Sequence, residues 1–206
     1  MAEPRLEADE VLLVNSDETN NQHQRNGADD DQIDWIPFDP AMITTSQWWR
    51  HDINLCRVCV LEGVRLIPPA SSSSQQNLQH QWKAQLQEIQ LANSVTEIGP
   101  NSFAECQKLI KVRPPPPSVS SDLFYIGHST FFRCFRLIEL DFSWAHLLRR
   151  IPNHTMEGCT ALRVIHFPPR LESIGRMALF DCASLQTAAI PATVNSIHRG
   201  AFGNCS

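Results

Sequence analysis

Five cysteines recur at nearly regular intervals, and this periodicity constrains the fold more than any other feature of the 206-residue chain. An isoleucine stands eight residues before each of them, and a large apolar residue stands three residues before each. Such self-similarity at a fixed period is typical of a solenoid, in which each repeat is one supersecondary unit. The spacings are 28, 25, 23 and 23 residues, between Cys106, Cys134, Cys159, Cys182 and Cys205.

Two weaker copies precede the regular ones. The stretches LCRVCVLEGVRLI (55–67) and LQEIQLANSVTEI (86–98) keep the leucine-to-isoleucine interval of a regular repeat, with a polar loop between them. We therefore predict about six repeats over residues 55–206, the second degenerate and the last incomplete. A lone repeat buries too little apolar surface to offset the ordering of its backbone, so the copies must stack and share apolar faces.

The phrase I-G-x-x-x-F-x-x-C-x-x-L-x-x-I-x-x-P-x-x-V-x-x-I resembles the BspA-type leucine-rich repeat over about residues 55–205. The resemblance implies an α/β repeat solenoid, a right-handed superhelix with one parallel strand per repeat and a short helical turn near each cysteine. The motif is specific for a fold and says little about a ligand. Members of the family include surface adhesins.

The N-terminal part of the chain differs in character from the repeats. Residues 1–40 hold eleven acidic and two basic residues, a net charge of −9, and the remainder has 15 basic and 11 acidic residues. We expect an acidic disordered tail over residues 1–33, because this segment has few apolar side chains to bury. Residues 34–54, which include DWIPFDP, are expected to cap the first repeat or to serve as a docking segment.

No export or membrane signal is evident in this sequence. The start, MAEPRLEADEVLLV, is acidic and has a four-residue apolar run, whereas a signal peptide needs a basic start and about 7–15 apolar residues. No run reaches the roughly 20 apolar residues that span a membrane. We therefore expect a cytoplasmic protein that does not contact membranes, with its thiols reduced.

The periodic cysteines favour core packing over chemistry. One cysteine per repeat could form a sulfur ladder, but cysteine is a small residue that is often buried in tight turns. The pair Cys56 and Cys59 lacks the second pair, or the histidines, that a zinc site needs. We predict no metal, no cofactor and no catalytic residues.

The outward face of the predicted strands provides the candidate binding site. In the pattern L-x-x-V-x-V, the first, fourth and sixth positions face the core, and the third and fifth point outward because a strand alternates. Charges of both signs occupy these outward positions, so neighbouring strands could pair them and neutralise the face. Alternatively the face binds a partner, as solenoid faces do. The candidate residues are Lys111, Arg113, Glu139, Asp141 and His166.

These features favour a non-enzymatic module that binds a protein partner through the sheet face. The face mixes signs and lacks an aromatic row, so it does not resemble a nucleic-acid site. Two alternatives remain: a cell-surface adhesion or recognition fragment, and an adaptor that docks through its N-terminal segment.

Overall fold

The computed structural model describes residues 57–60, 64–67, 69, 81–116 and 121–205, together with the backbone of residues 36–38. All described residues belong to one unit, Asp34–Ser206. The predicted acidic tail, residues 1–33, therefore lies outside the described residues. Of the predicted cap, residues 34–54, only strand β1 is described.

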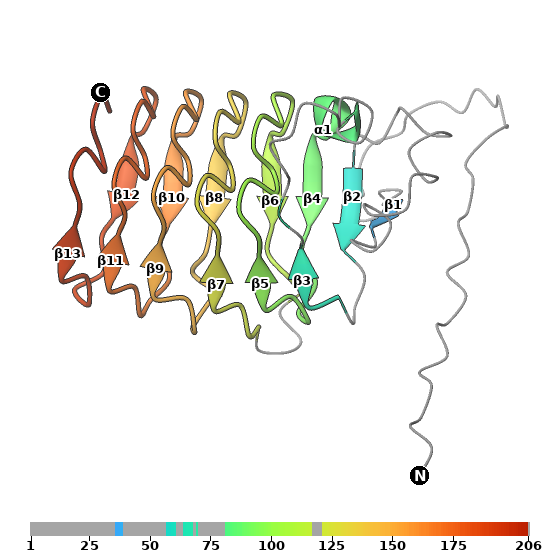
Figure 1. Cartoon of the computed structure of the whole chain (residues 1–206), viewed down its shortest axis with the longest axis horizontal. Coiled ribbons are helices and arrows are strands. Elements are labelled where there is room, and N and C mark those ends of the chain that lie inside the picture. The colour runs from blue at the N-terminus through green and yellow to red at the C-terminus, as the bar shows by residue number, and fades with distance from the viewer. Residues whose placement is uncertain are drawn as a thin grey trace, which may run out of the picture. The chain divides into compact units, whose positions relative to one another are not determined.

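The described repeats stack through two rows of parallel strands (Figure 1). The long strands form one seven-stranded sheet in the order β1-β2-β4-β6-β8-β10-β12. Their bounds are Ile36–Phe38, Arg57–Val60, Glu88–Gln90, Lys111–Arg113, Glu139–Asp141, Val164–His166 and Thr187–Ala189. The short strands are β3 (Leu66–Ile67), β5 (Glu97–Ile98), β7 (Tyr125–Ile126), β9 (Arg150–Ile151), β11 (Ser173–Ile174) and β13 (Ser196–Ile197).

The short strands form two separate sheets. One sheet contains β3, β5 and β7, and the other contains β9, β11 and β13. The five two-residue strands from β3 to β11 follow the same rule: the isoleucine faces the core, and the residue before it is more exposed. The isoleucines of β3 to β11 are at most 1% exposed, whereas Ile197 of β13 is 50% exposed.

The predicted solenoid of parallel strands is confirmed, but two details implied by the family resemblance are wrong. Each repeat contributes two strands rather than one. The segment before each cysteine is a series of turns, and the single helix of the described residues is α1 (Gln81–Gln85). Residues in left-handed conformation stand at both ends of each such segment, for example Asn101 and Glu105. A residue with left-handed φ and ψ departs from the right-handed helical conformation. The segment between two such residues therefore does not continue as a helix.

These left-handed positions recur in register with the repeat. One lies three residues after the isoleucine and the other directly before the cysteine, and each regular turn has both. Two of them are glycines, Gly158 and Gly200, with φ of 76° and 68°. The others carry side chains, and an L-residue in this region costs on the order of 1 kcal/mol relative to glycine.

Replacing Glu105 with glycine is therefore expected to stabilise the protein. Glu105 is exposed and has φ 63°, so Glu105→Gly should raise the free energy of unfolding by about 1 kcal/mol. Glu105→Ala keeps the Cβ and removes the charge, and we expect no comparable gain. Urea unfolding of both variants checks this, and an equal gain in both would assign the effect to charge.

The core is a continuous stack of equivalent side chains. The residue three positions before each cysteine is fully buried in four successive turns, as Phe103, Phe131, Met156 and Leu179. The rings of Phe103 and Phe131 stack with centroids 5.5 Å apart. Shared burial of this kind between neighbouring turns provides most of the stability of a repeat array.

The predicted packing role of the cysteines is confirmed, with a specific hydrogen bond added. Cys106, Cys134, Cys159 and Cys182 are buried free thiols, and Cys205 is half-buried. The Sγ of Cys134 donates to the carbonyl of Phe103 at 3.1 Å, and the Sγ of Cys159 donates to the carbonyl of Phe131 at 3.1 Å. Cys182 and Cys205 repeat the contact at 3.3 and 3.2 Å with Met156 and Leu179. We call this set of contacts the thiol ladder.

A buried lysine occupies the equivalent position in the degenerate repeat. Lys83 lies three residues before Leu86, as each ladder cysteine lies three residues before its leucine. Its Nζ donates to the carbonyls of Asn101 and Ala104 at 3.0 and 3.3 Å, and burial lowers its pKa. The long side chain thus satisfies carbonyls of the next turn, and α1 carries it there.

Candidate functional site

The structure places the five predicted site residues on one face of the seven-stranded sheet. Lys111 and Arg113 lie on β6, Glu139 and Asp141 on β8, and His166 on β10. Val112, Leu140 and Ile165, which alternate with them, are buried, so the inward and outward positions are as predicted. The register aligns Lys111 with Glu139 and aligns Val164 with Glu139 on the other side.

The charges on this face pair only in part as the sequence suggested. Arg113 forms an ion pair with Glu88 on β4, with Nη2 and Oε2 3.2 Å apart, and Arg57 approaches the same carboxylate at 3.9 Å. Arg113 and Asp141 occupy equivalent outward positions on neighbouring strands, where the alternation predicts that they pair, but they form no ion pair, and the β6–β8 pairing ends at Val112 and Leu140. Pro114 follows directly on β6, and its missing N–H cannot extend the ladder.

The remaining candidates are in different environments. The Nε2 of His166 lies 3.5 Å from Oε1 of Glu139, and both side chains are about half exposed. Asp141 accepts a hydrogen bond from the backbone N–H of Ser143 at 2.8 Å, so it shapes the turn that follows β8. Lys111 is exposed and has no ion pair within the described residues.

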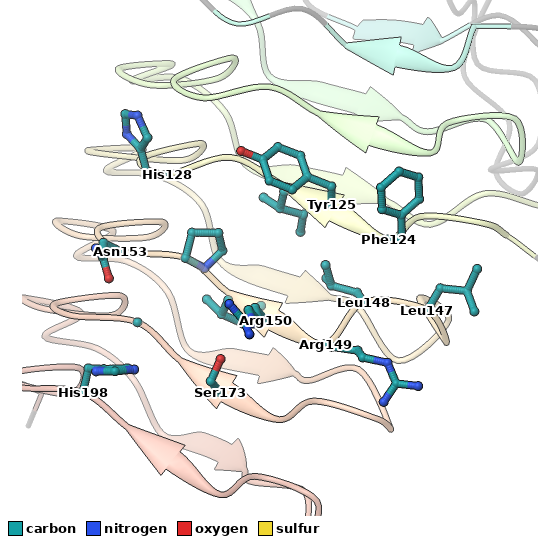
Figure 2. Close-up of a pocket in the computed structure, with 14 residues that line it drawn as sticks. Phe124, Tyr125, His128, Leu147, Leu148, Arg149, Arg150, Asn153, Ser173 and His198 are labelled. Atoms are coloured by element: carbon teal, nitrogen blue, oxygen red, sulfur yellow. The ribbon is translucent and has the colours of Figure 1, made fainter.

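Sequence reasoning missed a second surface, a hollow of about 650 Å³ beside the short strands (Figure 2). We call it the β7–β9 hollow, because it lies where the two sheets of short strands meet without pairing. Its walls come from β7, β9, β11 and the segments next to them, and from the residue after β13. They include Phe124, Tyr125, His128, Leu147, Arg149, Arg150, Asn153, Ser173 and His198.

The irregular cysteine spacings occur in the two repeats that contain β7 and β9, beside this hollow. The cysteine spacings of 28 and 25 residues exceed the regular spacing of 23. In both repeats the extra residues lie at the same corner, between the long and the short strand. In the second of them the extra residues fall between Phe142 and Leu148. Trp144 secures this corner, because its Nε1 donates to the carbonyl of Asp141 at 2.7 Å and its ring packs on Phe142. The spacings of 28 and 25 were the signal that could have revealed the site.

A proline accounts for one of the hydrogen bonds missing between β7 and β9. In four other turns the residue after the isoleucine donates its N–H to the preceding isoleucine carbonyl, for example Gly127 to Ile98 at 2.7 Å and Gly175 to Ile151 at 2.8 Å. The equivalent residue after Ile151 is Pro152, which has no N–H. The carbonyl of Ile126 therefore lacks the donor that the other turns supply, and the ladder is interrupted there.

Within the described ranges, no cluster of three or more histidine, cysteine, aspartate or glutamate side chains could hold a metal ion. The same residues include no helix long and apolar enough to span a membrane.

The fold and its two surfaces define a leucine-rich-repeat solenoid. The sequence also matches the family described as "BspA type Leucine rich repeat region", with six copies over residues 77–206. This match covers more than half of the chain, and the protein therefore belongs to that family. A comparison with curated proteins finds no match.

Solved structures of bacterial leucine-rich repeat proteins are similar to this chain. A leucine-rich cell surface protein from Faecalibacterium prausnitzii is 22% identical with a TM-score of 0.48, covering 69% of this chain and 41% of that chain. A protein from Eubacterium ventriosum is 19% identical with a TM-score of 0.41, covering 61% and 39%. The T. pallidum leucine-rich repeat protein is 18% identical with a TM-score of 0.31, covering 62% and 77%. The chain thus spans about two fifths of the first two structures.

Proposed function

We propose that this chain is a non-enzymatic protein-recognition module that binds its partner through the outward face of the seven-stranded sheet. One observation carries the proposal: β6, β8 and β10 present Lys111, Glu139 and His166 as exposed side chains on adjacent strands of a continuous sheet. Repeat arrays use such extended faces to bind proteins. The family match supports recognition as the general role of the fold.

The charge arrangement supports specificity more than raw affinity. Glu88 is engaged by two arginines, so this end of the face is largely neutralised within the chain. Lys111 and the Glu139–His166 pair remain available on the strands that follow. Exposed charges of this kind steer the encounter and fix the register of a partner. A location inside the cell belongs to the same proposal, and five free thiols are consistent with it.

Exchanging Lys111 and Glu139 tests the proposal. The two residues are Cα partners, so Lys111→Glu with Glu139→Lys keeps opposite charges adjacent and should leave the thermal midpoint unchanged. We expect partner affinity to fall about tenfold, which corresponds to about 1.4 kcal/mol. Arg113 and Asp141 are left intact because Arg113 pairs with the half-buried Glu88 and Asp141 holds the turn after β8, whereas the Glu139–His166 contact that the exchange removes is 3.5 Å long and about half exposed.

The measurement compares cross-linked capture of partners from source cells by wild type and variant, followed by the affinity of the captured protein. The matched control is Asp122→Lys with Arg136→Glu, an equal exchange of exposed charges outside the sheet. A partner that the control and the exchanged variant retain equally would exclude the sheet face as its binding site.

A further inference from the structure

The β7–β9 hollow gathers exposed apolar side chains that the sheet face does not have. Phe124, Tyr125 and Leu147 are 52%, 42% and 43% exposed, and all three line the hollow. An exposed cluster of large apolar side chains on a soluble domain commonly marks an interaction site. Leu147 comes from a corner that holds extra residues, whereas Tyr125 lies on β7 and Phe124 directly before it, both at regular positions of the repeat.

The hollow is also positively charged. The described residues that line it include two arginines and two histidines and no aspartate or glutamate. Arg149 pairs with Glu172, but Arg150 is exposed and has no ion pair within the described residues. On the side of β11 its Cα partner is Ser173, a neutral residue. On the other side β7 is not paired with β9, and its residue at the equivalent repeat position is Tyr125, so no carboxylate of an adjacent strand is aligned with Arg150.

Apolar and polar groups occupy different ends of the hollow. Figure 2 shows Phe124 and Leu147 near the corner where the short strands begin, and His128, Asn153 and His198 along the turns at the opposite end. Arg150 lies between these two groups. A ligand that fills the hollow would therefore meet an apolar contact, a guanidinium and a set of hydrogen-bonding groups in succession. A guanidinium binds carboxylates well because its planar donors match their geometry.

From this arrangement we propose that the β7–β9 hollow binds a linear acidic peptide of a partner protein. A large apolar side chain of the peptide packs against Phe124 and Leu147, and a neighbouring carboxylate pairs with Arg150. The site is separate from the sheet face. Charge complementarity selects an acidic rather than a basic segment, and the apolar wall requires more than charge alone.

The surroundings favour a peptide over a nucleic acid. A nucleic-acid site tracks the phosphate backbone with several cations and stacks successive bases on aromatic rings. Here one of the two arginines is already neutralised, and Glu97 is the Cα partner of Tyr125 on its far side. Preferential binding of RNA is therefore an outcome that would overturn the proposal.

The test uses the full chain and a set of short fluorescent peptides. Each peptide combines several Asp or Glu residues with one Leu, Phe or Trp, and matched sets replace the acids with Lys or Ser. We expect wild type to prefer the acidic set, and Arg150→Glu to weaken that binding at least about tenfold. Leu147→Ser should weaken binding of peptides with the apolar residue but not of those without it. Arg136→Glu, an exposed arginine that does not line the hollow, is the matched control and should bind as wild type.

The outcomes separate this site from the sheet face. Acidic peptides that still bind the Lys111/Glu139 exchange variant but not Arg150→Glu support the hollow. Equal binding of acidic and basic sets, unchanged binding by Arg150→Glu, or tighter binding of single-stranded RNA than of any peptide would each overturn the proposal. Thermal melting of every variant excludes unfolding as the cause of a loss.

Discussion

Alkaline pH should unfold this protein steeply, with stability beginning to fall near pH 9. Burial raises the pKa of Cys106 and Cys159 from 9.0 to about 12, and it raises those of Cys134 and Cys182 in the same direction. A thiol whose folded pKa exceeds its unfolded value contributes stability that is fully present below pH 9. That stability is lost as the pH rises towards the folded pKa, because the unfolded chain releases the proton first.

The expected effect is large because the thiols act together. Each thiol costs on the order of 1.4 kcal/mol per pH unit within its window, so Cys106 and Cys159 alone cost about 3 kcal/mol per unit between pH 9 and 12. Domains are typically stable by about 5–15 kcal/mol. Lys83 acts in the opposite direction, since its lowered pKa makes its contribution rise with pH up to its ordinary value of 10.5. One lysine does not offset four thiols.

Urea unfolding at a series of pH values, with reductant present, measures this slope. The matched variant is Cys159→Ser with Cys182→Ser, in which a hydroxyl can still donate to the carbonyls of Phe131 and Met156 but does not ionise in this range. The variant should be less stable at pH 7 and should lose stability less steeply above pH 9. An identical slope in both proteins would show that the buried thiols do not control the alkaline transition.

Replacing Gly127 with alanine should destabilise the array by about 3 kcal/mol or more. A Cβ at this position would lie 2.2 Å from the backbone nitrogen of Pro100 and 2.6 Å from the carbonyl carbon of Gly99. Both atoms are backbone of the preceding turn, so no side-chain rotation relieves the contact. The stack must separate locally, and the hydrogen bond from Gly127 to Ile98 is expected to weaken.

Gly200→Ala is the appropriate comparison for this substitution. Gly200 has φ 68°, and its nearest neighbour, Met177 Cγ, would lie 3.4 Å from the added Cβ. Its cost should therefore be the backbone strain alone, about 1 kcal/mol. Thermal and urea unfolding of the two variants distinguish a steric clash between turns from a local conformational preference. Equal losses would contradict the steric interpretation.

The sequence predicted the long strands, their register and their buried positions because these follow from a repeated alternation. Val58, Ile89, Val112, Leu140 and Ile165 all face the core where the pattern places them. The short strands were missed because two residues are too few to show an alternation. The left-handed residues were missed because most are not glycine, so composition gave no sign of them.

The candidate site was predictable only in part. Alternation placed Lys111 and Glu139 outward and opposite each other, as the structure has them. It could not show that Arg113 reaches Glu88, because that choice depends on where Pro114 ends the pairing and on side-chain length. The β7–β9 hollow is lined by residues from four turns, and it lies where β7 and β9 do not pair. Such a feature arises from stacking and is not contained in any one repeat.

The interruption at Pro152 also has a mechanical consequence. The long-strand sheet runs without a break from β1 to β12, whereas the short-strand side is divided between β7 and β9. At that level strand hydrogen bonds join the two repeats on the long-strand side only, and on the short-strand side the next bonds are those of the turns, such as Ser129 N–H to the carbonyl of Asn153 at 3.1 Å. A bending load on the stack would therefore concentrate its deformation there, with β6 and β8 acting as the pivot. The hollow that we propose as a peptide site lies on the side that would open and close.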